Sequence, residues 1–136
     1  MKKKLYKNNK IEVKSSKIQG YGVFAKKDIK KDEILEECHY IEVDNTYKVH
    51  SYCFCWPRGE DFKKYVIALG YGTIYNGCDS GDEHADWKTD TNNNIFVFYA
   101  TKDIKKNEEI RSPDNTYDFT CFINNCMFCN YWIYFI

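Results

Sequence analysis

A repeated twelve-residue segment constrains the fold more than any other feature of the chain. Residues 24–35 read FAKKDIKKDEIL and residues 99–110 read YATKDIKKNEEI, so seven of the twelve aligned positions are identical. Asp32 and Asn107 occupy the turn position where a residue tolerant of positive φ is needed, and Ile29 and Ile104 are expected to point inward. We predict two similar β-hairpins around a central segment, where a functional site would lie. The alternative is chance similarity in a lysine-rich chain.

Short apolar and β-branched pieces recur between polar turns along the whole sequence. They lie at residues 11–13, 22–25, 34–36, 40–43, 52–56, 66–68 and 95–100. Many short strands at close spacing are typical of a mostly β protein. A turn or two of helix is expected only near residues 60–65. With two prolines and no linker-like stretch, the 136 residues predict a single domain over 1–136.

The charges of the chain balance, with 20 lysines and arginines against 20 aspartates and glutamates. No global basic field therefore favours direct binding to nucleic acid. No apolar run reaches the roughly 20 residues of a membrane helix, and the lysine-rich start lacks an apolar secretory signal. We expect no membrane association and an intracellular location, cytoplasmic or, in a eukaryotic host, nuclear. The seven cysteines, an odd number, favour reduced thiols over a disulfide framework.

Two glycine-containing segments are candidates for ligand binding. The first is Gly20-Tyr21-Gly22, where glycines flanking an aromatic residue allow the backbone to approach a ligand closely. The second is residues 68–79, ALGYGTIYNGCD, in which glycines alternate with aromatic residues. Taken alone, the first segment is more often a glycine turn that binds nothing. The second, taken alone, indicates only that backbone and aromatic rings lie close together.

The order of the segments resembles a known family. A Gly-x-Gly-x-Phe-Ala turn is followed by Asp-Ile-x-x-Asp-Glu, by Leu-Gly-Tyr-Gly-x-x-Tyr-Asn and by Ala-x-x-Asp-Ile-x-x-x-Glu-Glu-Ile. This succession is similar to the SET domains of protein lysine methyltransferases, in particular the compact viral and bacterial forms. It covers a core of about residues 11–111 and leaves a C-terminal tail, 112–136, rich in aromatic residues and cysteines. The resemblance implies a mostly β SET-type fold of several small β-sheets, with a knot-like C-terminal crossing and few short helices.

The resemblance also implies an activity, that of an S-adenosylmethionine-dependent protein lysine N-methyltransferase. Gly20, Tyr21, Gly22, Asn76 and Gly77 would bind the cofactor. A substrate lysine would enter from the opposite face through a narrow channel. In-line methyl transfer needs the amine, methyl carbon and sulfur aligned, and an aromatic channel lowers the pKa of the attacking lysine.

Tyrosines suit the walls of such a site, because the ring faces a cationic sulfonium and the hydroxyl orients the amine. The candidates are Tyr52, Tyr71, Tyr75 and Tyr117, for each of which packing in the core is the alternative role.

The sequence departs from the family pattern at two positions. Gly77 stands where the family usually has histidine, and Asp114 stands where a catalytic tyrosine is expected. Tyr117 is the first tyrosine after this point. A longer loop could bring Tyr117 to the site, where it would orient the amine. Alternatively, the chain is a non-catalytic SET module that binds a protein partner or the cofactor without turnover.

The cysteines and the tail leave further alternatives open. Many SET enzymes hold zinc in a cysteine cluster, and Cys78, Cys121, Cys126 and Cys129 lie near the corresponding places. Their spacing differs from that pattern, so buried cysteines and no metal are favoured over zinc. The tail could close the channel or form a homodimer through Phe128, Tyr131, Trp132, Tyr134 and Phe135. Acidic residues 79–90 would suit a protein substrate with an accessible lysine in a basic, histone-like tail.

Overall fold

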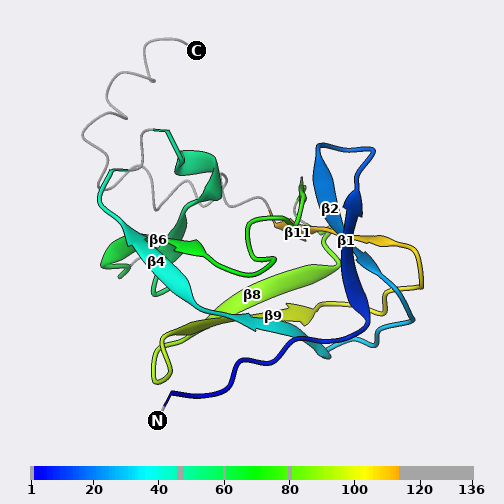
Figure 1. Ribbon diagram of the computed structural model, residues 1–136, viewed down its shortest axis with the longest axis horizontal. Helices are drawn as coiled ribbons and strands as arrows, with labels where there is room; N and C mark the ends of the chain where they lie inside the picture. Colours follow the sequence, from blue (N-terminus) through cyan, green and yellow to red (C-terminus); the bar gives the residue numbers. More distant parts are fainter. Residues whose placement is uncertain (1, 46–47, 60, 80, 114–136) are drawn as a thin grey trace.

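The computed structural model describes residues 2–113, except 46–47, 60 and 80. Within these ranges the chain forms short strands and one 3₁₀ turn (Figure 1). They are β1 (Ile11–Ser15), β2 (Tyr21–Ala25), β3 (Ile34–Cys38), β4 (Tyr40–Val43), η1 (His50–Tyr52), β5 (Phe54–Trp56), β6 (Lys64–Ala68), β7 (Gly77–Cys78), β8 (Ala85–Asp90), β9 (Ile95–Ala100), β10 (Glu109–Ile110) and β11 (Ser112–Pro113). The predicted mostly β fold is confirmed. No helix of the described part is long and apolar enough to cross a bilayer.

The strands form four small sheets, as expected. Their orders are β1-β2-β10, β3-β9-β8, β4-β6-β5 and the parallel pair β7-β11. Figure 1 shows β4 and β6 on one side of the central β8 and β9, and β1 and β2 on the other. The knot-like crossing stays a prediction, because the chain after Pro113 lies outside the described residues.

The predicted helical turn near residues 60–65 is wrong. Lys64–Ala68 is the strand β6, which pairs antiparallel with β4 on one side and β5 on the other. Val66 and Ala68 are buried while Tyr65 and Ile67 are half-buried. This alternation is the pattern of a strand, and pairing on both edges outweighs the local preference of a short segment.

The two repeats are present, but they are not hairpins. The two strands of each copy belong to different sheets and pair with the other copy. Phe24 of β2 lies opposite Glu109 of β10, and Ile34 of β3 lies opposite Tyr99 of β9. These two pairs are equivalent positions in the aligned repeats. The two repeats therefore pair with each other. Each strand of one copy forms a ladder with a strand of the other copy, and the two strands within a copy do not pair.

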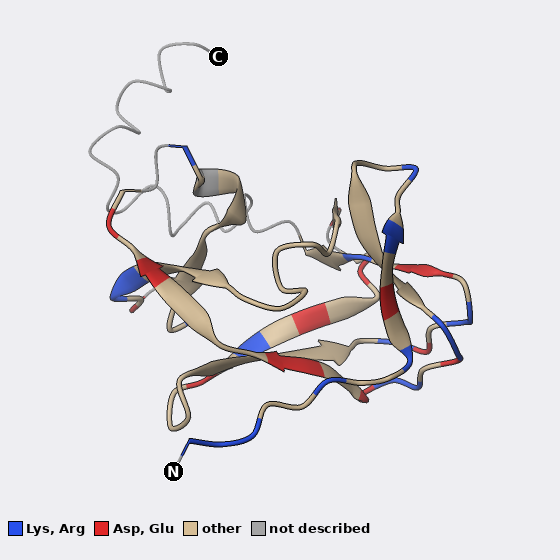
Figure 2. Cartoon of the chain, in the orientation of Figure 1, with Lys and Arg blue, Asp and Glu red and all other residues tan. Residues whose placement is uncertain are grey.

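Reciprocal contacts join the two turns. The backbone N–H of Ile29 donates to the Ile104 carbonyl at 2.8 Å, and the reverse bond is 2.7 Å. Both isoleucines are 1% exposed, which confirms that they point inward. Asp32 and Asn107 have φ of 71° and 74°, as predicted for the turn position. Figure 2 shows basic and acidic residues interleaved along the chain, so the lysines of the turns do not gather into one continuous basic stretch.

Aromatic residues fill the core between two of the sheets. The strand β9 is an almost continuous apolar run, and Phe96 and Phe98 are fully buried. Phe54 and Trp56 of β5 each lie 5.1 Å from the Phe96 ring, which packs the sheet β4-β6-β5 onto β3-β9-β8. A short unbroken apolar run is what a strand covered on both faces requires.

Candidate functional site

A cavity of about 530 Å³ opens between the β1–β2 turn and the segment that follows β6. Its walls come from three stretches of chain that are far apart in the sequence. They are Gln19, Gly20 and Tyr21, then Ser51 and Tyr52, then residues 72–77. A volume in this range is typical of small-molecule sites. The two glycine segments singled out in the sequence thus meet at one place.

Four of the five predicted cofactor residues line this cavity: Gly20, Tyr21, Asn76 and Gly77. Gly20 has φ of +48°, and nothing lies within 4 Å of the Cβ position that it lacks. The positive φ favours glycine at this turn, and the space beside the residue is open.

Gly22, the fifth predicted residue, lies beneath the cavity and does not line it. A Cβ added to Gly22 would lie 2.2 Å from Oε1 of Glu109 and 3.1 Å from Nδ2 of Asn76. Gly22 therefore makes room for a carboxylate that the sequence reasoning did not single out as a site residue.

Glu109 and Asn76 hold the β1–β2 turn against the rest of the site. Nδ2 of Asn76 lies 2.7 Å from Oε1 of Glu109 and 3.1 Å from the carbonyl oxygen of Tyr21, and it donates to both. The Ser16 hydroxyl lies 2.9 Å from each Glu109 oxygen. The bond between Asn76 and the Glu109 carboxylate is charge-assisted, and such bonds are stronger than neutral ones. It holds the Asn76 amide in the position from which it donates to the Tyr21 carbonyl.

Gly77 lies where β7 pairs with β11. Its carbonyl oxygen accepts a hydrogen bond from Nη2 of Arg111 at 2.9 Å, and the Asn76 carbonyl accepts one from the Ser112 N–H at 3.0 Å. Both carbonyls already have partners within the protein.

A buried carboxyl group, Glu36, lies behind the cavity wall. Its Oε1 accepts the Tyr75 hydroxyl at 2.9 Å, and Tyr75 itself lines the cavity. Burial raises the pKa of Glu36, and the hydrogen bonds from Tyr75 and the Tyr71 N–H oppose that rise. Burial also raises the pKa of Tyr75, followed by the charge of Glu36. Nothing in the local pattern of β3 distinguished this glutamate from a solvent-facing one.

The four candidate tyrosines are placed differently. Tyr52 and Tyr75 line the cavity, with Tyr52 about half exposed at its rim and Tyr75 buried. Tyr71 does not line the cavity, and its ring lies under the ammonium of Lys7 at 3.4 Å from the centroid. Tyr117 and Asp114 lie outside the described residues, so the catalytic assignment stays a prediction.

The structure tests only some of the predictions about cysteines. Cys78 is buried and free, and burial raises the pKa of its thiol. Cys121, Cys126 and Cys129 lie outside the described residues, as does the aromatic tail. Within the described part, no three His, Cys, Asp or Glu side chains are grouped to hold a metal. Cys55 is disulfide-bonded, so the expectation that every thiol is reduced is wrong at this position.

The acidic stretch 79–90 is only partly a loop. Its second half is β8, in which Ala85 and Trp87 face the core and Asp86 pairs with Arg58 at 2.7 Å. Asp79 and Asp82 are exposed. None of the described residues of this stretch lines the cavity.

Comparison with known proteins assigns the chain and its fold to a family. The model of the SET domain matches residues 20–112. A Schizosaccharomyces pombe histone-lysine N-methyltransferase, H3 lysine-37 specific, is 30% identical over 110 residues, covering 74% of this chain and 69% of that protein. The crystal structure of a Plasmodium falciparum protein assigned as a histone methyltransferase is similar with a TM-score of 0.63 and 29% identity, over 78% of this chain and 93% of that one.

Proposed function

The chain belongs to the SET-domain family, and on that premise we propose that it is an S-adenosylmethionine-dependent protein lysine N-methyltransferase. The observation that carries the proposal is the cavity in which Gly20 and Tyr21 meet Asn76 and Gly77. These are the segments that the family resemblance assigns to the cofactor.

The lining of the cavity fits this cofactor. Gly20 and Gly77 line the cavity without side chains beyond the backbone, and the aromatic residues Tyr21 and Tyr52 lie at the cavity with 68% and 52% of their surface exposed. Aromatic faces attract a cation such as a sulfonium. When bound, S-adenosylmethionine supplies the methyl group that is transferred.

The role of the protein is to align the amine and exclude water. A neutral lysine amine must lie in line with the methyl carbon, and holding it there accounts for much of the rate. We assign the orientation of the amine to Tyr117, whose hydroxyl would accept or donate a hydrogen bond at the nitrogen. The tyrosines of the cavity would keep water away from the reacting groups.

For the substrate we propose histone H3, because the S. pombe relative is described as specific for a lysine of H3. The exposed carboxylates Asp79 and Asp82 would attract a basic tail. Charge reversal in a double variant, Asp79→Lys with Asp82→Lys, should weaken substrate affinity while cofactor affinity is unchanged. Unchanged substrate affinity would remove these residues from the binding surface.

Calorimetric titration with S-adenosylmethionine and with S-adenosylhomocysteine tests the proposal. Saturable binding of either ligand supports it, and no binding to folded protein at millimolar ligand contradicts it. A Tyr117→Phe variant then separates the two alternatives left open by the sequence. An enzyme should lose methyl transfer and retain cofactor binding in this variant, whereas a non-catalytic SET module shows no transfer even as the wild type.

A further inference from the structure

The buried carboxyl group of Glu36 is separated from the cavity by one tyrosine side chain. Glu36 is 2% exposed, and the hydroxyl that it accepts belongs to Tyr75, a residue of the cavity wall. The Tyr75 ring is stacked on Phe98, with centroids 4.9 Å apart and an angle of 17° between the planes. Two contacts therefore fix Tyr75, one to its ring and one to its hydroxyl.

Burial raises the pKa of Glu36, and two hydrogen-bond donors partly oppose that rise. Oε1 accepts the Tyr75 hydroxyl, and Oε2 accepts the backbone N–H of Tyr71 at 3.3 Å. Donors stabilise a carboxylate, against the cost of burying it. The chain passes close to this carboxylate at Gly70. A Cβ on Gly70 would lie 3.1 Å from Oε2 of Glu36, so glycine is the residue that fits there.

No cation neutralises this carboxylate directly. Among the described residues, Glu36 forms no ion pair within 4 Å. The ammonium of Lys7 lies over the Tyr71 ring, 3.4 Å from its centroid, and acts on Glu36 from a distance. The field of the carboxylate is therefore only partly offset, and in a poorly solvated interior it extends into the cavity.

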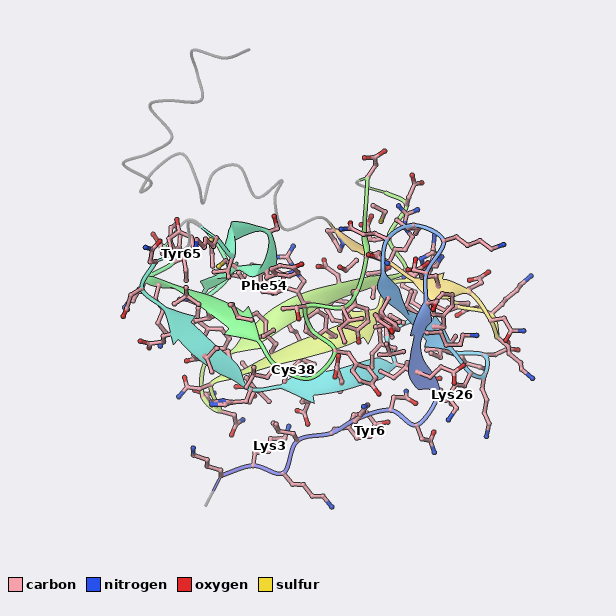
Figure 3. All side chains as sticks on the ribbon, turned by 45° about the horizontal axis from the view of Figure 1, so that its top comes forward. Lys3, Tyr6, Lys26, Cys38, Phe54 and Tyr65 are labelled. Atoms are coloured by element: carbon pink, nitrogen blue, oxygen red, sulfur yellow. The ribbon has the colours of Figure 1, made fainter. Side chains whose placement is uncertain are left out.

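The next residue, Glu37, has a different environment and provides a matched comparison. Its carboxylate pairs with Lys3 and accepts the N–H of Tyr6 at 3.0 Å. Figure 3 shows Lys3 and Tyr6 on the N-terminal segment, which runs along the outside of the sheet that contains Cys38. Successive side chains of a strand point to opposite faces, so Glu37 faces this segment and Glu36 faces the cavity.

We propose that the Glu36 carboxylate makes the cavity selective for the positively charged sulfonium cofactor over its neutral thioether product, and that Glu36 positions Tyr75 for this contact. The proposal rests on the function proposed above. S-adenosylmethionine and S-adenosylhomocysteine differ by one methyl group and one positive charge. A negative charge behind the wall attracts the sulfonium and not the neutral thioether, so it favours the charged ligand over the product.

The test is the ratio of the two dissociation constants, measured by calorimetry for the full chain. For Glu36→Gln, which keeps the size and removes the charge, we expect the preference for S-adenosylmethionine to fall, by about tenfold if the pair interacts with about 1.4 kcal/mol. Glu37→Gln makes the same charge change on the other face and should leave the ratio unchanged. Glu36→Asp retains the charge and should retain most of the preference.

Different outcomes separate this inference from the function on which it rests. If wild type binds neither ligand, the proposed function fails. If Glu36→Gln weakens both ligands equally, or if Glu37→Gln changes the ratio as much, the inference is overturned and the function stands. Should Glu36→Gln not fold, Tyr75→Phe takes its place, because it keeps the ring and removes one donor from the carboxylate. A smaller shift of the ratio in the same direction supports the proposal, and an unchanged ratio contradicts it.

Discussion

The side-chain nitrogen of Asn76 lies 2.7 Å from Oε1 of Glu109, 33 residues later in the chain. This bond joins the cavity-lining segment to the second repeat, and the same nitrogen donates to the Tyr21 carbonyl in the first glycine turn. Three distant segments are thus held by one amide group. The geometry of the cavity therefore depends on side chains that lie mostly behind it.

Replacing Asn76 should weaken both cofactor binding and the stability of the fold. Asn76→Asp keeps the shape but loses the donor and places a second carboxylate beside Glu109. We expect at least tenfold weaker binding of S-adenosylmethionine and a loss of about 1–3 kcal/mol in the free energy of unfolding. Calorimetry and urea unfolding measure the two effects. The exposed Asn92→Asp should change unfolding by less than about 0.5 kcal/mol, and an equal effect of both variants would contradict the role of Asn76.

Gly22→Ala tests whether residue 22 must be glycine because the Glu109 carboxylate lies beside it. The added methyl would lie 2.2 Å from Oε1 of Glu109, so the carboxylate must move and release Ser16 and Asn76. Overpacking of this kind costs about 1–3 kcal/mol, measured by urea unfolding.

A double-mutant cycle with Glu109→Ala gives the control for Gly22→Ala. Removing the clashing carboxylate should relieve most of the cost of the alanine, so the two effects should not add. Additive effects would show that the Glu109 carboxylate is not the reason why residue 22 is glycine.

The sequence predicted the parts of the fold more successfully than their connections. The repeat, the positive φ of Asp32 and Asn107 and the mostly β class follow from local patterns and are confirmed. The exchange of strands between the repeats was missed, because identical patterns do not say which edge each strand will meet. Pairing between distant strands is a tertiary property.

The cavity-lining residues Gly20, Tyr21, Asn76 and Gly77 were predicted from the family resemblance, and their binding of a cofactor stays a prediction. Gly20 and Gly77 were identified by their places in the family's motifs. Glu36 and Glu109 were not, because a glutamate in a strand looks the same in the sequence whether it faces solvent or an interior hydroxyl. Only the contact with Tyr75 identifies Glu36 as part of the site.

The reciprocal turn contacts predict equal effects of two matched substitutions. Oδ1 of Asp28 accepts the Lys106 N–H at 2.9 Å, and Oδ1 of Asp103 accepts the Lys31 N–H at 2.9 Å. Asp28→Ala and Asp103→Ala should each lower the free energy of unfolding by about 0.5–2 kcal/mol, as for the loss of a cap. Chemical denaturation of both variants measures this. Effects that differ severalfold would show that the repeats are not energetically equivalent.

Glu33 should contribute to acid sensitivity. The backbone N–H of Lys30, followed by Lys10, holds the pKa of Glu33 below its ordinary value of 4.5. A carboxyl with a lowered folded-state pKa stabilises the fold above its unfolded pKa and loses this contribution as pH falls through the folded pKa. Between pH 5.5 and pH 3, Glu33→Gln should therefore lose less stability than wild type. The difference should be below about 1 kcal/mol, because the pair is partly exposed.

Urea unfolding at both pH values measures this difference. Glu42→Gln is the comparison variant, because it removes an exposed carboxylate that is also paired with a lysine, Lys64. A Glu33→Gln variant that loses as much stability as wild type would exclude Glu33 as a contributor.

The most direct test of the central claim is mass spectrometry of histone H3 after incubation with the full chain and S-adenosylmethionine. We predict methylation of a lysine, with Tyr117→Phe abolishing it and Asn76→Asp reducing it by at least tenfold in proportion to lost cofactor binding. Folded protein that binds the cofactor but methylates neither histone H3 nor any other basic protein would contradict the claim that this chain is a lysine methyltransferase.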